Sequence, residues 1–152
     1  NGDWGFGIMA FGECLPYHEN KVSINKDVKD IYGLPTLTMD AEWKDNEKAM
    51  RVDMMDAAAE MLEAAGIKDV KTYDHGCNPG LGIHEMGTAR MGLDPKTSVL
   101  NKWNQIHSVP NVFVTDGSFM TSASCVNPSL TYMAFTARAV NFAVEELKKG
   151  NL

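Results

Sequence analysis

The fold of this chain is limited most strongly by a long run of apolar residues at helical spacing. From Asp45 the apolar side chains recur every three or four residues, which places them on one face of an α-helix. They are Met50, Met54, Ala57, Ala58, Met61, Leu62 and Ala65. Asp45 or Asn46 can cap the start of this helix, and Gly66 can end it in the left-handed conformation. Because methionine more often fills an irregular core than lines a binding groove, the pattern predicts a scaffold helix over residues 45–65.

Several shorter segments alternate bulky residues with small or polar ones, with the period of two that is typical of β-strands. The segments predicted to be strands are Trp4–Gly12, the stretch around Val22 and Ile24, Leu37–Ala41, Val70–Tyr73, Ser98–Asn101 and Val112–Val114. Turn residues at positions 19–20 and 33–35 separate the first three, so these are expected to pair antiparallel. The sequence therefore predicts an α+β fold, in which an antiparallel sheet from the first half is backed by the helix at 45–65.

A second helix is predicted over Pro128–Lys149. Proline at the first helical position loses no hydrogen-bond donor, and Gly150 after two lysines provides a stop. The first turns are apolar on almost every side, at Leu130, Tyr132, Met133, Ala134 and Phe135. This end of the helix is therefore expected to be buried.

The composition is that of an acidic globular protein. Of the 152 residues, 44% are hydrophobic and 22% are charged, and the formal net charge is -6. Scattered basic residues in an acidic chain argue against a nucleic-acid surface, which needs clustered lysine and arginine. The cysteines Cys14, Cys77 and Cys125 form no CxxC pair, which argues against a disulfide framework or a zinc ribbon. No apolar run approaches the ~20 residues that a membrane span needs.

His84 lies in a loop rich in glycine and is the strongest candidate for a catalytic base. Oxidation of an alcohol needs a group that takes the hydroxyl proton, and a neutral imidazole suits that task near physiological pH. A lone histidine on a loop is more often structural than catalytic, so the choice between these roles for His84 depends on the residues around it. A metal-dependent hydrolase using His75, Cys77 and His84 is an alternative, although their spacing matches no common zinc pattern.

Two other turns combine polar residues with suitable backbone positions. Asp116 and Gly117 follow an apolar strand, and Asn127 and Pro128 open the second helix. A helix N-terminus carries unpaired N–H groups and roughly half a positive charge, so it favours an anion. Each turn also has a purely structural explanation, as a strand-ending Asp-Gly turn and as a helix cap.

Three motifs occur in an order that resembles a known enzyme family. GIHEMGTARMG at 82–92, VFVTDGS at 112–118 and NPSLTYMAFTARA at 127–139 resemble the C-terminal part of the glucose-methanol-choline (GMC) family of FAD-dependent oxidoreductases. The run at 15–40, LPYHENKVSINKDVKDIYGLPTLTMD, is similar to a segment of the family's substrate-binding sheet. The resemblance implies that His84, in its HxxGTxRMG pattern, is the catalytic base. It also implies that Asn127 hydrogen-bonds the substrate oxygen.

By the same resemblance, both turns contact the cofactor FAD. Asp116, with Gly117 after it, matches a family position near the ribityl chain and phosphates, where a carboxylate accepts hydroxyl protons. The start of the second helix matches the backbone that cradles the pyrimidine end of FAD, which is anionic when reduced. The residues expected there are Asn127, Pro128, Ser129 and Thr131. Arg90 is expected to be structural and to bond loop carbonyls, and Cys77 and Cys125 are expected to pack as free thiols.

The resemblance also divides the chain and gives it partners. Residues 1–85 would belong to the substrate-binding region and residues 86–152 to a flavin-facing segment. No GxGxxG turn for the ADP half of FAD occurs here, so the chain is expected to be cut from a longer cytoplasmic or periplasmic enzyme. The expected partners are the upstream remainder of that enzyme, an alcohol or sugar substrate and an electron-acceptor protein. An alternative is that the piece alone is a stable fold without activity.

Overall fold

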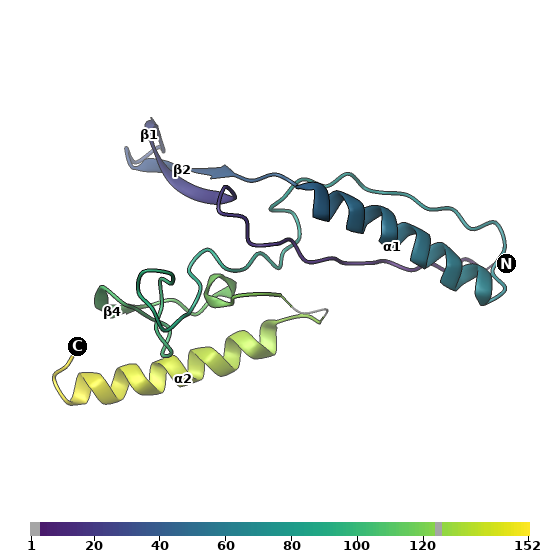
Figure 1. Cartoon of the computed structure of the whole chain (residues 1–152). Coiled ribbons are helices and arrows are strands. Elements are labelled where there is room, and N and C mark those ends of the chain that lie inside the picture. Colours follow the sequence, from purple (N-terminus) through teal and green to yellow (C-terminus); the bar gives the residue numbers. More distant parts are fainter. Residues whose placement is uncertain (1–3, 124–125) are drawn as a thin grey trace.

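The computed structural model describes residues 4–123 and 126–152. Its elements follow in the order β1 (Lys21–Lys29), β2 (Pro35–Asp40), α1 (Asp45–Ala64), β3 (Gln105–Ile106), β4 (Val109–Phe113), a 3₁₀ turn (Gly117–Phe119) and α2 (Ser129–Lys148). Two separate antiparallel hairpins and two long helices are compatible with the predicted α+β class. Figure 1 shows α1 and α2 in separate parts of the molecule, linked by extended chain.

The β1–β2 hairpin has one apolar and one polar face. Val22 lies opposite Met39 and Ile24 opposite Leu37, so these four side chains share one face. All four are exposed within the described chain. The sequence predicted that the helix at 45–65 backs this sheet, but α1 extends beyond the end of β2 instead (Figure 1). Because an isolated hairpin is marginally stable in water, this face requires a cover.

Hydrogen bonds donated by backbone N–H groups define both ends of α1. Lys44 precedes the first helical residue, and Glu47 Oε2 accepts a hydrogen bond from the Lys44 N–H at 3.1 Å. The cap is therefore Lys44 and not Asp45 or Asn46, the two residues predicted for it. At the other end Gly66 is left-handed with φ of 83°, as predicted, and its N–H bonds back to the last turn at 2.9 Å.

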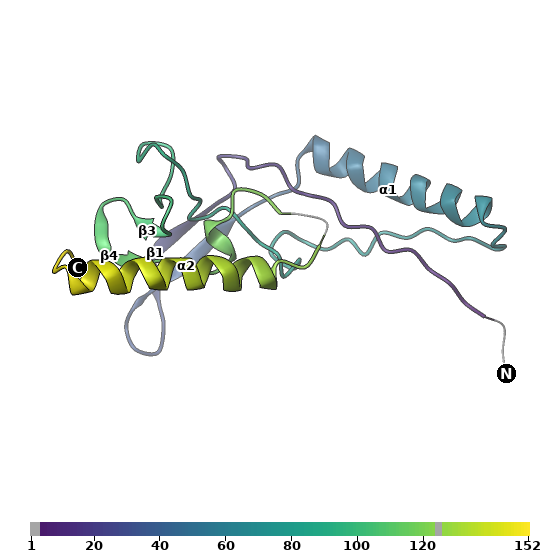
Figure 2. The same ribbon diagram turned by 90° about the horizontal axis from the view of Figure 1, so that it is seen from below.

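The methionine stripe of α1 contacts the extended N-terminal segment, which runs beside the helix in Figure 2. A Cβ added to Gly12 would lie 2.5 Å and 2.7 Å from the Cε and Sδ atoms of Met50, so the end of the Met50 side chain packs directly on the backbone of Gly12. Farther along the helix, Met61 is 62% exposed. The predicted packing role therefore holds for the first turns of the stripe and not for its whole length.

Two of the predicted strands are wrong. Trp4–Gly12 and Val70–Tyr73 contain no strand and make no bridge. Alternation specifies an extended chain, but a strand also needs a neighbour for its main-chain hydrogen bonds, and neither segment has one among the described residues. The short strand predicted at 98–101 reduces to isolated bridges at Leu100. The strand predicted at 112–114 overlaps the observed β4.

The buried apolar residues of the described chain all lie in its second half. They are Leu100, Phe119, Pro128 and Ala139. Phe119 stacks on Phe135 of α2 with ring centroids 4.8 Å apart, and it meets Tyr132 edge-on at 6.3 Å. These rings fix the first half of α2 against the 3₁₀ turn.

Only one side of α2 is covered by the described chain. Leu130 is 78% and Met133 is 68% exposed, so the predicted burial of the first turns is wrong for these residues. The reason is that Phe119 packs on one face of the helix while the described residues place nothing over the other. The helix stops before Gly150 as predicted, and this glycine is left-handed with φ of 76°. Neither α1 nor α2, nor any other helix in the described ranges, is long and apolar enough to cross a membrane.

Candidate active site

His84 lies in a loop bent by left-handed residues. Ile83 before it has φ of 56°, and Gly87 after it has φ of 90°. A β-branched residue in this conformation costs about 1–3 kcal/mol and persists only where its surroundings fix it. Glu85 Oε1 accepts a hydrogen bond from the Gly82 N–H at 2.7 Å and closes the loop. The half-buried His84 is therefore carried on a short and constrained turn.

Two backbone hydrogen bonds join the chain after this loop to the 3₁₀ turn. The Ala89 N–H donates to Ser118 O at 3.0 Å, and the Met91 N–H donates to Phe119 O at 2.9 Å. Because Phe119 is itself anchored in the core, the segment that follows His84 is fixed relative to α2. The structure thus brings the first and second predicted motifs together.

Gly117 permits a close approach of three segments. A Cβ at this position would lie 3.1 Å from Glu85 O and 2.7 Å from the hydroxyl oxygen of Tyr132. Such distances are shorter than close-packed interiors allow between non-bonded atoms. The 3₁₀ turn therefore fits between the His84 loop and α2 because Gly117 has no side chain. Tyr132 was not predicted as a site residue, since a tyrosine in an apolar helix reads as core.

Asp116 caps the 3₁₀ turn. Its Oδ1 accepts hydrogen bonds from the N–H of Ser118 at 2.9 Å and from the Ser118 hydroxyl. This is the strand-ending turn that the sequence also allowed. The carboxylate is exposed, and its second oxygen makes no hydrogen bond to a described residue. Asp116 can therefore hold the turn and still accept a hydrogen bond from a ligand hydroxyl.

The N-terminus of α2 has backbone amides that are unpaired within the helix. Pro128, predicted as the first helical residue, is the cap residue, and α2 starts at Ser129. The Tyr132 N–H donates to Pro128 O at 3.1 Å, so the amides of residues 129–131 precede the first intrahelical bond. No side chain of the described residues caps this end. Ser129 is exposed and Thr131 half-buried, so the end can receive an anion, worth up to ~2 kcal/mol.

The predicted pair of His84 and Asn127 comes from two different segments. Asn127 is exposed and directly precedes the buried Pro128. Within the part of the chain that the structure describes, no hydrogen bond joins His84 to Asn127. Their cooperation in one reaction therefore stays a prediction. Cys125, which the sequence also singled out, lies outside the described residues.

Comparison with known proteins decides the family. A family model described as GMC oxidoreductase matches residues 16–136, a range that contains the His84 loop, the 3₁₀ turn and the start of α2. The chain belongs to the GMC oxidoreductase family. The related GMC enzymes are flavin-dependent dehydrogenases and oxidases that act on alcohols and sugars.

Three curated GMC relatives show the extent of the similarity. The 2-methyl-1,2-propanediol dehydrogenase of Mycolicibacterium austroafricanum is 42% identical over 136 residues, covering 89% of this chain and 24% of the relative. The fructose dehydrogenase large subunit of Gluconobacter japonicus is 33% identical over 150 residues, covering 96% and 26%. The gluconate 2-dehydrogenase flavoprotein of Pantoea cypripedii is 33% identical over 135 residues, covering 84% and 22%. The chain thus spans about a quarter of the length of these relatives.

The metal-dependent hydrolase alternative does not agree with membership of the GMC family. Among the described residues, no three histidine, cysteine or acidic side chains converge in a way that could hold a metal ion. His75 instead meets the ring of Tyr73 edge-on with centroids 4.9 Å apart, and its neighbour Asp74 is ion-paired with Arg51. His75, Cys77 and His84 therefore do not form a shared site.

Arg90 of the GMC motif acts through its backbone. Its carbonyl accepts hydrogen bonds from the N–H groups of Val99 at 3.1 Å and Leu100 at 3.3 Å. The side chain is exposed and makes no hydrogen bond to a described residue, so the expectation that it bonds loop carbonyls is wrong within these residues. Cys77, expected to pack, is an exposed free thiol.

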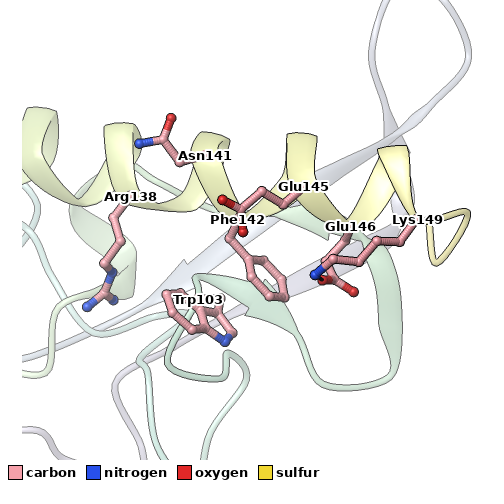
Figure 3. A pocket seen from close by; sticks show the side chains of 7 residues that line it. All are labelled: Trp103, Arg138, Asn141, Phe142, Glu145, Glu146 and Lys149. Atoms are coloured by element: carbon pink, nitrogen blue, oxygen red, sulfur yellow. Dashed lines mark hydrogen bonds and ion pairs between the residues drawn. The ribbon is translucent and has the colours of Figure 1, made fainter.

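A pocket of about 410 Å³ lies beside the second half of α2 in this GMC chain (Figure 3). It is lined by Trp103, Arg138, Asn141, Phe142, Glu145, Glu146 and Lys149. Trp103 stacks on Phe142 with centroids 4.7 Å apart, and Arg138 lies over Trp103 and donates to Lys102 O. These contacts fasten the turn at 101–105 to α2. None of the predicted site residues lines this pocket.

Proposed function

We propose that this chain is the C-terminal part of an FAD-dependent enzyme that oxidises a CH–OH group of an alcohol or a sugar. The observation that carries the proposal is the pair of hydrogen bonds from Ala89 and Met91 to the 3₁₀ turn. They make the loop of the candidate base and the turn expected near the cofactor one structural unit.

In the proposed reaction, His84 takes the proton of the substrate hydroxyl as the carbon–hydrogen bond breaks. A positioned general base of this kind typically contributes a rate factor of about 10²–10⁴. Asn127 donates a hydrogen bond from its amide to the substrate oxygen and holds that oxygen toward His84. FAD, when bound, supplies the acceptor for the hydride.

The residues of the site suit a cofactor that is anionic and carries hydroxyl groups. The unpaired amides at the start of α2, beside Asn127 and Pro128, can donate to the anionic edge of FAD. The open carboxylate oxygen of Asp116 can accept from a ribityl hydroxyl. A helix N-terminus contributes at most ~2 kcal/mol toward an anion, whereas micromolar binding needs about 8 kcal/mol. These contacts therefore orient the cofactor, and most of its binding energy comes from other parts of the enzyme.

The exposed apolar faces of the chain support a larger parent enzyme. One is the hairpin face of Val22, Ile24, Leu37 and Met39, and the other is the uncovered side of α2. Contiguous apolar surfaces of this kind mark interfaces. We assign their cover to the upstream remainder of the same enzyme, with residues 1–85 on its substrate side and residues 86–152 on its flavin side.

The substrate class in the proposal follows the names of the relatives. These names contain 2-methyl-1,2-propanediol, which is a diol, fructose, which is a sugar, and gluconate, which is a sugar acid. We therefore assign an alcohol, polyol, sugar or sugar acid to this enzyme. Electrons would then pass from the reduced enzyme to an acceptor, and an acceptor protein is one candidate for this role.

Stopped-flow reduction of the full-length enzyme by its alcohol substrate tests the roles of His84 and Asn127. His84→Ala should slow reduction about 10²- to 10⁴-fold while flavin content stays near normal. Asn127→Ala should be milder, because one lost hydrogen bond costs about 1–3 kcal/mol. Unchanged reduction in His84→Ala would remove the assigned base. A more severe defect in Asn127→Ala would require the two roles to be exchanged.

The isolated 152 residues should be colourless, inactive on alcohols and prone to self-associate through the uncovered side of α2. They lack the Gly-rich turn that binds the ADP half of FAD in dinucleotide-binding folds. Gel filtration followed by an absorbance scan measures this. Flavin bands that stay with the protein through the column would show that the chain holds FAD unaided and that the incomplete-enzyme proposal is wrong.

A further inference from the structure

The segment around Glu13 is held from both sides by α1. Gly12, before it, lies directly against Met50, where a Cβ would be 2.5 Å from the methionine Cε. Leu15, after it, donates its N–H to Glu47 Oε1 at 3.0 Å. Glu47 is buried in the first turn of α1, so its carboxylate is a fixed acceptor. The position of Glu13 is therefore set by the helix although its own segment forms no strand.

The side chain of Glu13 reaches the other half of the molecule. Its Oε1 accepts a hydrogen bond from the Ala123 N–H at 2.8 Å, between residues 110 positions apart in the sequence. Ala123 follows the 3₁₀ turn in a stretch without regular secondary structure. A backbone amide in such a stretch has no helix or ladder acceptor, and the carboxylate supplies one.

Ala123 leads directly into the candidate site. It is followed, four residues later, by Asn127 and then by the buried Pro128 that caps α2. On its other side the chain is fixed at Phe119, whose carbonyl accepts from Met91. The Glu13 carboxylate therefore binds the chain at Ala123, which lies between Phe119 and Asn127 in the sequence.

We propose that Glu13 is a positioning residue, which holds the chain at Ala123, four residues before Asn127, and thereby sets the placement of Asn127 relative to His84. The role of Asn127 rests on the proposed function, whereas the contact between Glu13 and Ala123 does not. Glu13 acts through the reach of its side chain to one amide. Its negative charge takes no part in proton transfer.

Two substitutions in the full-length holoenzyme separate reach from charge. Glu13→Gln keeps an acceptor oxygen at the same reach and removes the charge. Glu13→Asp keeps the charge and is one methylene too short for the Ala123 amide. Glu19→Ala is the matched control, because Glu19 is an exposed carboxylate in the following turn with no hydrogen bond to a described residue.

We expect Glu13→Asp to lower the rate constant of flavin reduction at saturating substrate about 5- to 30-fold, the equivalent of roughly 1–2 kcal/mol. Flavin content should stay near that of the wild type, since most of the cofactor's binding energy comes from other parts of the enzyme. Glu13→Gln should keep most of the rate and the same pH profile, and Glu19→Ala should match the wild type. Hydrogen-exchange mass spectrometry of the peptide containing Ala123 should show faster exchange in Glu13→Asp only.

Several outcomes would overturn the inference. Unchanged exchange and reduction in Glu13→Asp would show that the contact holds nothing. A shifted pH profile in Glu13→Gln would show that the charge, and not the reach, matters. An enzyme that exchanges faster at Ala123 yet reduces its flavin normally would limit Glu13 to a structural contact. If no alcohol reduces the wild-type flavin, the proposed function fails, while the exchange measurement still decides the contact.

Discussion

The two halves of this chain are stabilised by different kinds of interaction. In residues 86–152 the buried side chains are mainly apolar, at Leu100, Phe119 and Ala139, and aromatic rings connect the loops to α2. In residues 4–85 the buried side chain is that of Glu47, a carboxylate that is 1% exposed. The second half therefore has a small core of its own. The first half is organised around hydrogen bonds to one charge, and the apolar face of its hairpin is exposed within the described chain.

The carboxylate of Glu47 accepts several hydrogen bonds. It accepts from the Leu15 N–H at 3.0 Å, from the Lys44 N–H at 3.1 Å and from the Tyr17 hydroxyl at 3.3 Å. Burial by itself raises the pKa of the Glu47 carboxyl, but the hydrogen bonds, first that of Leu15, outweigh it and hold the pKa below its ordinary value of 4.5. The same residue therefore starts α1, orders the segment at 15–17 and remains charged.

The largest effect should come from the core of the second half. Phe119→Ala removes a buried ring stacked on Phe135 and should destabilise the chain by about 3–5 kcal/mol. Urea denaturation followed by near-ultraviolet circular dichroism measures the loss. A change below about 1 kcal/mol would mean that the second half has no independent core, and the contrast between the halves would disappear.

Gly117→Ala tests the close approach of the His84 loop to α2. The added methyl would meet the hydroxyl of Tyr132 and the carbonyl of Glu85, so we expect a loss of about 1–3 kcal/mol. Ser118→Ala is the comparison variant, since it adds no atoms to the same turn and removes only the hydroxyl hydrogen bond to Asp116. If the paired variant Gly117→Ala with Tyr132→Phe regains stability, the clash lies with the hydroxyl. If it does not, the Glu85 carbonyl is the obstacle.

Glu47→Gln tests the hydrogen-bonded charge of the first half. The amide keeps one acceptor oxygen and puts a donor where the Lys44 N–H needs an acceptor, so about 1–3 kcal/mol should be lost at pH 7. Because the folded pKa is below the unfolded value, the contribution of the charge is present above pH 4.5 and disappears as the pH falls through the folded pKa. Unfolding free energies of both proteins from pH 7 to pH 3 should therefore converge at the acid end. A difference independent of pH would contradict the role of the charge.

The smallest effect is expected on the open part of α1. Met61 is 62% exposed, so Met61→Ala should change the stability of the isolated chain by less than about 0.5 kcal/mol. The same substitution in the full-length enzyme should cost more if the parent covers this face. Equal and small effects in both would show that the stripe stays in water and would weaken the view that the first half is completed by other residues.

The sequence predicts the helices of this chain better than its strands. A helix is specified locally, by apolar spacing and a left-handed glycine at its end, and both Gly66 and Gly150 serve as expected. A strand depends on a neighbour that can be far away, which is why the alternation at Trp4–Gly12 predicted an extended segment correctly and a strand wrongly. The cap at Lys44 was missed because the usual capping sequence has a serine or threonine three residues before the glutamate. Here a lysine occupies that position before Glu47.

The candidate site shows the same limit. Sequence motifs identified His84, Asp116 and the start of α2 as candidates. The hydrogen bonds donated by Ala89 and Met91 connect the segment after His84 to the turn that Asp116 caps. Neither Tyr132 over Gly117 nor the contact from Glu13 to Ala123 has a local signature, because each joins distant segments. Side chains that link elements are invisible to patterns that describe one element at a time.

The two backbone hydrogen bonds between the segment after His84 and the 3₁₀ turn affect how this region tolerates amino-acid substitutions. Their donors and acceptors are main-chain atoms of residues 89, 91, 118 and 119, so no particular side chain is required to make the bonds. The sequence there is free to drift within the space that each side chain fills. Proline is the exception, because at position 89 or 91 it would delete a donor and release the loop. The position of the His84 loop relative to the 3₁₀ turn thus depends on main-chain atoms. It is expected to persist through side-chain substitutions that would abolish a contact made by side chains.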